Sequence, residues 1–246
     1  MLNKIYIRFL SLIISAIDNP NKKKIVYFFK KRLNEKSLNI LDVGAHKGET
    51  IDLFYQNFNI NKIFAFEANS DIFKELENKI IKKDYQKKIT LVNIGLGSKE
   101  DIKYLNVLND SSSSTFNDID QETKYFKKKE KILSFLKSGE AIFQDKLKTK
   151  ILPLSSFEEL QSITSIDILK IDTEGYELNV LKGINTEFFK KIKFIYFEHH
   201  YDLMIKKNYN YRDIKKILNE NNFKLSFKTK MKFRKTFEYI YENEKN

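Results

Sequence analysis

An apolar run that ends in an acidic residue and a glycine turn constrains the fold of this chain most strongly. Residues 39–43 read as a buried strand, Gly44 and Gly48 bracket a tight turn, and an amphipathic helix follows over residues 48–58. A strand, a glycine turn and a helix in this order bring the backbone close to a ligand at the carboxyl end of the strand. The segment therefore predicts an α/β unit with a ligand site at that end.

A carboxylate at the end of the next predicted strand indicates the kind of ligand. Residues 62–67 end in Glu67, about 20 residues after the glycine turn, where a carboxylate can accept both hydroxyls of a ribose. The turn lacks the third glycine of the G-x-G-x-x-G pattern, so a nucleoside without phosphates fits it better than a pyrophosphate. S-adenosylmethionine is the common cofactor of that kind. The residues expected to bind it are Asp42, Gly44, His46, Gly48, Glu67 and Asn93.

A second motif makes this interpretation specific. Residues 170–177 (KIDTEGYE), followed by Leu181 and Gly183, resemble the K-x-D-x-E-G-x-E…L-x-G core of the FkbM family of S-adenosylmethionine-dependent methyltransferases. Residues 42–48 (DVGAHKG) resemble the D-V-G-A-N-x-G turn of the same family, with His46 in place of the usual Asn. Residues 112–114 are three serines, where the family often carries a serine-rich segment, while residues 154–157 (LSSF) stand in place of the usual Leu-Asp-Asp. The resemblance covers residues 38–200.

Strand-like and helix-like segments alternate from residue 38 onward, which favours an α/β fold with a mainly parallel sheet. We expect a class I methyltransferase (Rossmann-like) fold, with a doubly wound, mostly parallel seven-stranded sheet and a reversed terminal strand. Helices are expected over 48–58, 70–83 and 211–221, with a further one starting at 176. Strands are expected at 39–43, 62–67, 89–94, 166–171 and 194–197, with a closing antiparallel pair at 223–228 and 235–241.

Two parts of the chain lie outside this alternation. Residues 1–36 are expected to form an N-terminal helical appendage to a methyltransferase domain that spans 37–246. The apolar residues 5–17 precede three lysines (22–24) and are too few to span a bilayer. They predict a helix packed on the domain or on the second subunit of a homodimer, or alternatively a peripheral membrane contact. Residues 108–150 predict an inserted substrate lid over the carboxyl edge of the sheet.

Carboxylates and histidines gather at two predicted strand ends. Asp172 and Glu174 follow the strand at 166–171, and residues 198–200 (EHH) end the strand that begins at 194. A hydroxyl accepts a methyl group poorly unless a base or a metal ion removes its proton, and histidine is the natural base near neutral pH. We therefore expect Asp172, Glu174 and His199 as catalytic residues, and Asp172 with His199 could also hold Mg²⁺ or Mn²⁺. Capping of the following helix is the alternative role for the two carboxylates.

Composition narrows the function without deciding the acceptor. The 45 Lys and Arg against 33 Asp and Glu give a net charge of +12, but the lysines are scattered, so nucleic acid is not the expected partner. The absence of cysteine excludes a disulfide framework, a thiolate metal site and a cysteine nucleophile, and it fits a cytoplasmic protein. The family resemblance implies an O-methyltransferase that acts on a hydroxyl of a sugar, glycan or natural product. An RNA methyltransferase and a non-catalytic cofactor-binding protein of a glycan pathway are the alternatives.

Overall fold

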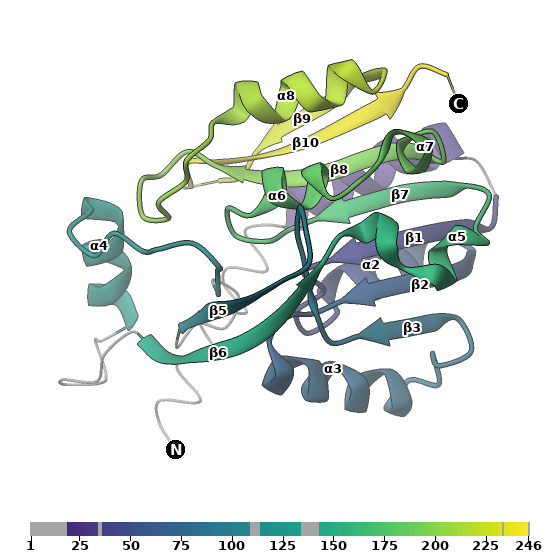
Figure 1. Cartoon of the computed structure of the whole chain (residues 1–246). Helices are drawn as coiled ribbons and strands as arrows, with labels where there is room; N and C mark the ends of the chain where they lie inside the picture. The colour runs from purple at the N-terminus through teal and green to yellow at the C-terminus, as the bar shows by residue number, and fades with distance from the viewer. Residues whose placement is uncertain (1–18, 34–35, 109–113, 134–142, 233, 246) are drawn as a thin grey trace.

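The computed structural model describes residues 19–33, 36–108, 114–133, 143–232 and 234–245. Seven strands form one sheet in the order β3-β2-β1-β7-β8-β10-β9 (Figure 1). Neighbouring strands are parallel from β3 to β8, whereas β10 runs antiparallel to both β8 and β9. This order confirms the predicted sheet with its reversed terminal strand. The strands are β1 (Leu38–Val43), β2 (Ile60–Phe66), β3 (Ile89–Val92), β7 (Ile166–Ile171), β8 (Ile192–His200), β9 (Phe223–Lys230) and β10 (Thr236–Asn243).

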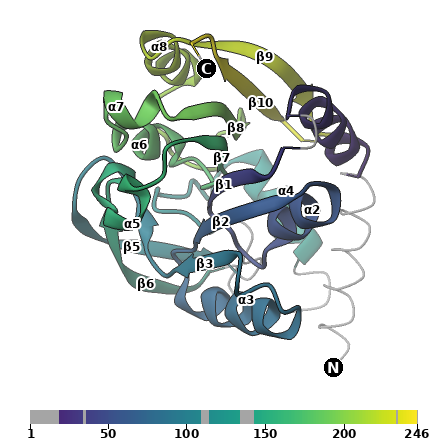
Figure 2. The ribbon, with the colours of Figure 1, turned by 90° about the vertical axis from the view of Figure 1, so that its right-hand side faces the viewer.

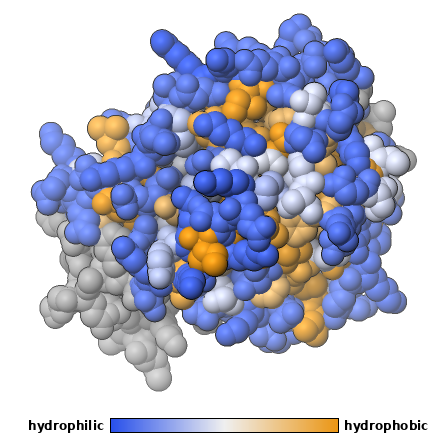
Figure 3. All heavy atoms as spheres, viewed as in Figure 1, coloured by the Kyte–Doolittle hydropathy of each residue, from blue (hydrophilic) through white to orange (hydrophobic). Residues whose placement is uncertain are grey.

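Helices cover both faces of this sheet and bury two hydrophobic cores. One core joins the sheet to α2 and α3, and the other joins it to α6, α7 and α8. The central strand β7 is buried at all six positions, as expected for a strand that is covered on both faces. The face seen in Figure 1 is mostly hydrophilic, with hydrophobic side chains showing in smaller areas (Figure 3). The helices are α2 (Glu49–Asn57), α3 (Ser70–Lys82), α5 (Glu158–Gln161), α6 (Glu177–Lys182), α7 (Thr186–Phe189) and α8 (Tyr211–Glu220).

An N-terminal helix packs on the same face of the sheet as α2. Residues 19–33 are helical, and their apolar side chains Ile25, Phe29 and Leu33 are buried in the α2 and α3 core (Figure 2). The Asn21 side chain donates a hydrogen bond to the carbonyl of Lys230 at 2.9 Å. The apolar stretch predicted at residues 5–17 lies outside the described residues. Within the described ranges, no helix is both long and apolar enough to cross a membrane.

A second sheet of three strands stands beside the first. Its order is β4-β6-β5, formed by Gly95–Leu96, Phe143–Leu152 and Asp101–Leu108, and α4 (Lys124–Leu133) lies between β5 and β6 in the chain (Figure 1). The sequence analysis missed this sheet, because it assigned residues 108–150 to a loop and a helix. The signal was present: in β6 lysines at alternate positions are exposed, while Thr149 and Ile151 are buried.

Gly44 allows the ends of two central strands to meet. Its φ angle is +78°, and a Cβ at this position would lie 1.9 Å from the carbonyl oxygen of Asp172. The Asp172 amide donates to the carbonyl of Val43 at 2.9 Å, and the Gly44 amide donates to the carbonyl of Phe66 at 2.9 Å. The absence of a side chain at Gly44 therefore first allows the turn to contact the end of β7. From the sequence, Gly44 was expected to contact the cofactor.

We predict that Gly44→Ala destabilises the fold by about 3 kcal/mol or more, because the added methyl group meets backbone that cannot move without breaking strand pairing. Gly48→Ala is the matched control. Gly48 has a φ of +74°, but its added Cβ would meet only the end of the Leu76 side chain at 2.7 Å. A loss of about 1–2 kcal/mol is expected there. Denaturant unfolding of both variants checks this, and equal losses would contradict the close approach at Gly44.

Candidate active site

Glu67 holds the glycine turn from the end of β2. Its Oε2 accepts the amide of His46 at 2.7 Å, and its Oε1 accepts the amide of Asn69 at 2.8 Å. The side chain is buried, and burial raises the pKa of its carboxyl group, against the lowering effect of these two amides. Each carboxylate oxygen can accept more than one hydrogen bond. Glu67 can therefore hold the turn and still accept hydroxyl groups of a ligand.

The other residues predicted to contact the cofactor shape this turn. His46 has a φ of 48°, in the left-handed region that Asn and His enter more readily than most residues, which explains how His replaces the usual Asn. Its Nδ1 lies 3.3 Å from Oε1 of Glu49. Gly48 is the N-cap of α2 and packs against α3. Asn93 donates its side-chain amide to the carbonyl of Glu67 at 2.8 Å, so it fixes the backbone at the end of β2.

A buried lysine joins the ends of β1 and β7. The Nζ of Lys170 lies 3.4 Å from Oδ1 of Asp42 and 3.3 Å from Oδ2 of Asp172. Asp42 is 1% exposed, whereas the Asp172 side chain is 32% exposed and faces the edge of the sheet. Burial opposes the charge of Lys170, but the carboxylates of Asp172 and Asp42 outweigh it and raise its pKa. Lys170 is therefore a permanent cation below the site.

The carboxylate of Asp42 is only partly stabilised by its surroundings. Burial raises its pKa to about 6, because the nearby charge of Lys170 only partly offsets the loss of water. Apart from the contact with Lys170, neither oxygen of Asp42 has a hydrogen-bond partner among the described residues. Asp42 contributes to the site through Lys170, below the surface that a ligand could reach.

Glu177 braces the loop between β7 and α6. Its Oε1 accepts the amide of Gly175 at 2.7 Å, and its Oε2 accepts the hydroxyl of Tyr209 at 2.5 Å. The loop carries two residues in the left-handed region, Glu174 at φ 48° and Gly175 at φ 91°. The N-cap of α6 is Tyr176, and it makes no side-chain capping bond. An N-cap role for Asp172, the alternative considered from the sequence, is therefore wrong.

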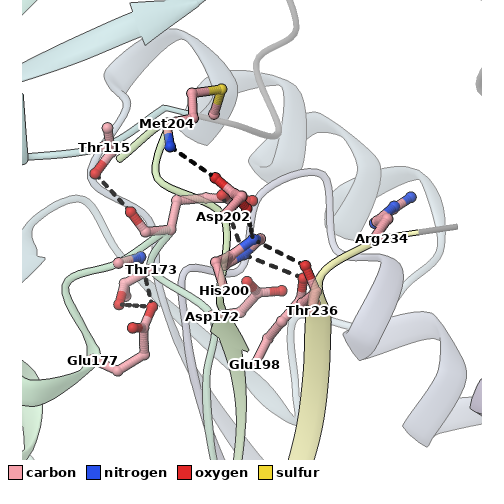
Figure 4. A network of polar contacts seen from close by, with 12 residues as sticks. Thr115, Asp172, Thr173, Glu177, Glu198, His200, Asp202, Met204, Arg234 and Thr236 are labelled. Carbon is pink, nitrogen blue, oxygen red and sulfur yellow. Dashed lines mark hydrogen bonds and ion pairs between the residues drawn. The ribbon is translucent and has the colours of Figure 1, made fainter. Parts of the chain in front are cut away.

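The structure brings His200 to this loop (Figure 4), and it places His199 among tyrosine side chains. The Nε2 of His200 lies 3.4 Å from Oε2 of Glu174. His199 is 2% exposed and packs among tyrosine rings, with ring centroids 4.9 Å from Tyr201 and 6.0 Å from Tyr209. Burial, with the charges of nearby cations, lowers the pKa of His199 to about 3. The expectation that His199 joins Asp172 and Glu174 is not met, because successive residues of a strand point to opposite faces.

The inserted segment touches the same loop. Thr115 donates its hydroxyl to the carbonyl of Glu174 at 2.7 Å, and Asn117 donates its amide to the carbonyl of Gly175 at 2.6 Å. Further along, Ile119 forms a β-bridge with Ile205 in the loop after β8. Thr115 and Asn117 therefore lie against the loop that carries Asp172 and Glu174, while Ile119 lies against the loop after β8. The contacts of Thr115 and Asn117 had no signal in the sequence, because they depend on how the insertion folds back.

Comparison with known proteins identifies the family. The family model described as "Methyltransferase FkbM domain" matches residues 42–225, which is most of the chain. The chain belongs to the FkbM methyltransferase family. This confirms the resemblance seen in the two sequence motifs, and residues 42–225 form a methyltransferase domain of this family. No curated protein matches the chain.

Solved structures share the fold. Methyltransferase FkbM from Methylobacillus flagellatus KT aligns with a TM-score of 0.52 at 14% identity and covers 83% of this chain. This chain spans 44% of the length of that protein. Magnesium protoporphyrin IX methyltransferase from Synechocystis PCC 6803, with bound S-adenosylhomocysteine, aligns with a TM-score of 0.51 at 12% identity and covers 95% of this chain and 86% of that one. At these identities the likeness shows the class I methyltransferase fold alone.

The predicted metal site finds no support in this FkbM domain. Among the described residues, no group of three or more His, Asp or Glu side chains is arranged to hold a metal ion. Lys170 already supplies a positive charge to Asp172, and His199 lies among tyrosines, away from that carboxylate. The donor set expected for Mg²⁺ or Mn²⁺ is therefore not assembled from Asp172 and His199.

We predict that Asp42→Asn stabilises the protein at pH 7 by about 1–3 kcal/mol, because ionised Asp42 is buried without full compensation. A carboxyl group whose pKa is raised on folding favours the folded state below its unfolded pKa of 3.8, and this contribution is lost as the pH rises through about 6. The advantage of the variant should therefore shrink as the pH falls from 7 to 4. Denaturant unfolding at the two pH values measures it, and a variant that is less stable at pH 7 would contradict the assignment.

Proposed function

We propose that this chain transfers a methyl group from S-adenosylmethionine to a hydroxyl of a sugar, glycan or related natural product. The observation that carries the proposal is the position of Asp172. Its partly exposed carboxylate stands at the carboxyl end of β7, and its backbone lies directly against the glycine turn that follows β1. In doubly wound sheets, ligands bind at this edge, beside the point where the strand order reverses. Methylation of a hydroxyl requires a base close to the cofactor, and Asp172 stands beside the turn that is proposed to bind it.

The residues around the turn fit the proposed cofactor. Glu67 would accept the ribose hydroxyls, and the turn from Gly44 to Gly48 would pass beneath the cofactor, with Asn93 fixing the backbone of Glu67. When bound, S-adenosylmethionine supplies an electrophilic methyl group. The protein supplies the buried carboxylate and the fixed backbone that would orient it. The bound S-adenosylhomocysteine of the Synechocystis protein, which shares the fold, supports this assignment.

We predict that Glu67→Gln weakens the binding of S-adenosylhomocysteine about tenfold to a hundredfold, because a neutral amide loses charge-assisted hydrogen bonds worth about 1.5–3 kcal/mol. Glutamine keeps one oxygen for a backbone amide of the turn, so the fold should persist. Isothermal titration calorimetry measures the affinity, and thermal unfolding serves as the fold control. Equal affinities of wild type and variant would remove Glu67 from the site.

Asp172 is proposed to take the proton of the acceptor hydroxyl. Its Oδ2 contacts Lys170, which leaves Oδ1 for the proton. The ion pair with Lys170 fixes the orientation of the carboxylate at the end of β7, so Asp172 is placed to act as a base. Proximity to the turn aligns this base with the proposed cofactor, because Gly44 contacts the backbone of Asp172 itself.

We predict that Asp172→Asn keeps the affinity for S-adenosylhomocysteine within about twofold and lowers turnover about 10²–10⁴-fold, because the amide cannot accept the proton. The measurement is methyl transfer from radiolabelled cofactor to a panel of nucleotide sugars, lipid-linked glycans and cell-surface glycans. Unchanged turnover of the variant on an accepted substrate would reject Asp172 as the base.

The charge around the site favours an uncharged polyhydroxyl acceptor over RNA. The carboxylates of Glu174, Glu198 and Asp202 gather within 3.6 Å of one imidazole ring, beside the loop of Asp172. Hydroxyl groups of a sugar donate hydrogen bonds to carboxylates, whereas a phosphate backbone would be repelled by them. If the panel stays unmodified and RNA is methylated, the proposed acceptor class is wrong. If cofactor binds and neither is methylated, the non-catalytic alternative is favoured.

A further inference from the structure

His200 connects four elements around the candidate acceptor site. Its Nε2 lies 3.4 Å from Oε2 of Glu174, in the loop after β7, and 3.3 Å from Oε1 of Glu198 on β8. Its Nδ1 lies 3.6 Å from Oδ2 of Asp202, in the loop after β8, and 3.2 Å from the hydroxyl of Thr236 on β10. Figure 4 shows the imidazole at the centre of these side chains. No other side chain named in the site contacts so many elements.

The surroundings of this ring keep it positively charged. Burial alone would lower the pKa of His200, but Glu174, Asp202 and Glu198 outweigh burial and raise it to about 10. The more distant Glu177 acts in the same direction. The side chains of the three contacting carboxylates are 4–18% exposed, so water screens their mutual repulsion poorly. A cation at their centre offsets the charges of Glu174 and Asp202, whereas burial and the charge of Asp172 raise the pKa of Glu198 well above its ordinary value and favour its neutral form.

Glu174 is the partner whose position matters for chemistry. It stands two residues after Asp172 and has a φ of 48°, a conformation that an ordinary side chain adopts only when its surroundings enforce it. Thr115 donates its hydroxyl to the carbonyl oxygen of Glu174, and the Nε2 of His200 lies within ion-pair distance of the Glu174 carboxylate, although it makes no hydrogen bond among the described residues. Without His200, the Glu174 carboxylate would lose this ion pair, and the loop beside Asp172 would lose one of its constraints.

We propose that His200 is a positioning residue of the acceptor site, which fixes the carboxylate of Glu174 and, through Asp202, the loop after β8. This inference rests on the proposed function, because it assumes that the acceptor enters beside Asp172. It replaces the role that the sequence suggested for His199. The register of the sheet explains the difference: Lys170 pairs with Tyr196, so residues 198 and 200 share the face of Lys170, and residue 199 points to the α8 side.

The pairing of His200 with Glu174 can be tested without any ligand, by NMR of the full chain labelled with ¹⁵N-histidine. The chain has three histidines, so single His→Gln variants assign every ring. We expect both nitrogens of His200 to be protonated at pH 8, while His199 stays neutral. In Glu174→Gln, which leaves His200 in place, the titration midpoint of His200 should fall by about one pH unit or more. The pairing would be overturned if His200 is neutral at pH 8, or if its titration midpoint is the same in wild type and in Glu174→Gln.

Glu49→Gln is the matched control for this experiment. It removes a carboxylate 3.3 Å from Nδ1 of His46, away from the contacts of His200, so it should leave the titration of His200 unchanged. Groups that face His200 are Glu174, Glu198, Asp202 and Thr236, and Lys207 donates to the carbonyl oxygen of His200. A shift of His200 in the Glu49 variant would show that its titration reports general charge and not the contact with Glu174.

The positioning role is tested on an acceptor found in the panel. His200→Gln should bind S-adenosylhomocysteine within about twofold of wild type and lose about tenfold to a hundredfold in kcat, because misplacement by about 1 Å costs this much. If wild type binds no S-adenosylhomocysteine, the proposed function fails while the NMR result on the pairing still stands. If wild type methylates the acceptor and His200→Gln does so with the same kcat and KM, the positioning role fails by itself.

Discussion

The ammonium group of Lys170 between Asp42 and Asp172 is the interaction on which the rest of the site depends. It ties β1 to β7 at the point where both strands end, in a region that water hardly reaches. Replacing Lys170 by a neutral residue is expected to cost about 3–5 kcal/mol, because the carboxylates of Asp42 and Asp172 would lose the charge that offsets theirs. With these strand ends joined, Gly44 contacts the carbonyl of Asp172, and Glu67 can hold the turn that follows. The cofactor turn and the proposed base are therefore one connected unit.

The loop after β7 is held from both sides of the sheet. On the α8 side, Glu177 accepts hydrogen bonds from Gly175 and Tyr209. On the opposite side, His200 contacts Glu174. The insertion adds the hydroxyl of Thr115, which donates to the carbonyl of Glu174. A loop with two consecutive residues in the left-handed region needs such constraints to keep one conformation. The proposed chemistry needs the same rigidity, since a base must stay aligned with its acceptor.

The sequence predicted the part of this arrangement that has a local signal. Strand period, glycine turns and strand-end carboxylates indicated a mostly parallel sheet with a reversed terminal strand, the family, and the positions of Glu67 and Asp172 at strand ends. Local patterns could not show that Gly44 faces the Asp172 backbone, because that contact joins residues far apart in the chain. The choice between His199 and His200 depended on the register of β8 against β7, which local patterns do not contain. The strand β6 was not predicted, because residues 108–150 were expected to form an inserted lid.

The central claim is that one carboxyl edge of the sheet holds both the cofactor and the base. A crystal structure of the full chain with S-adenosylhomocysteine tests it most directly. The account predicts that the ribose hydroxyls lie within hydrogen-bond distance of Glu67, that the cofactor crosses the turn from Gly44 to Gly48, and that its sulfur faces the carboxylate of Asp172. A cofactor bound away from Glu67, or with its sulfur pointing away from Asp172, would contradict it.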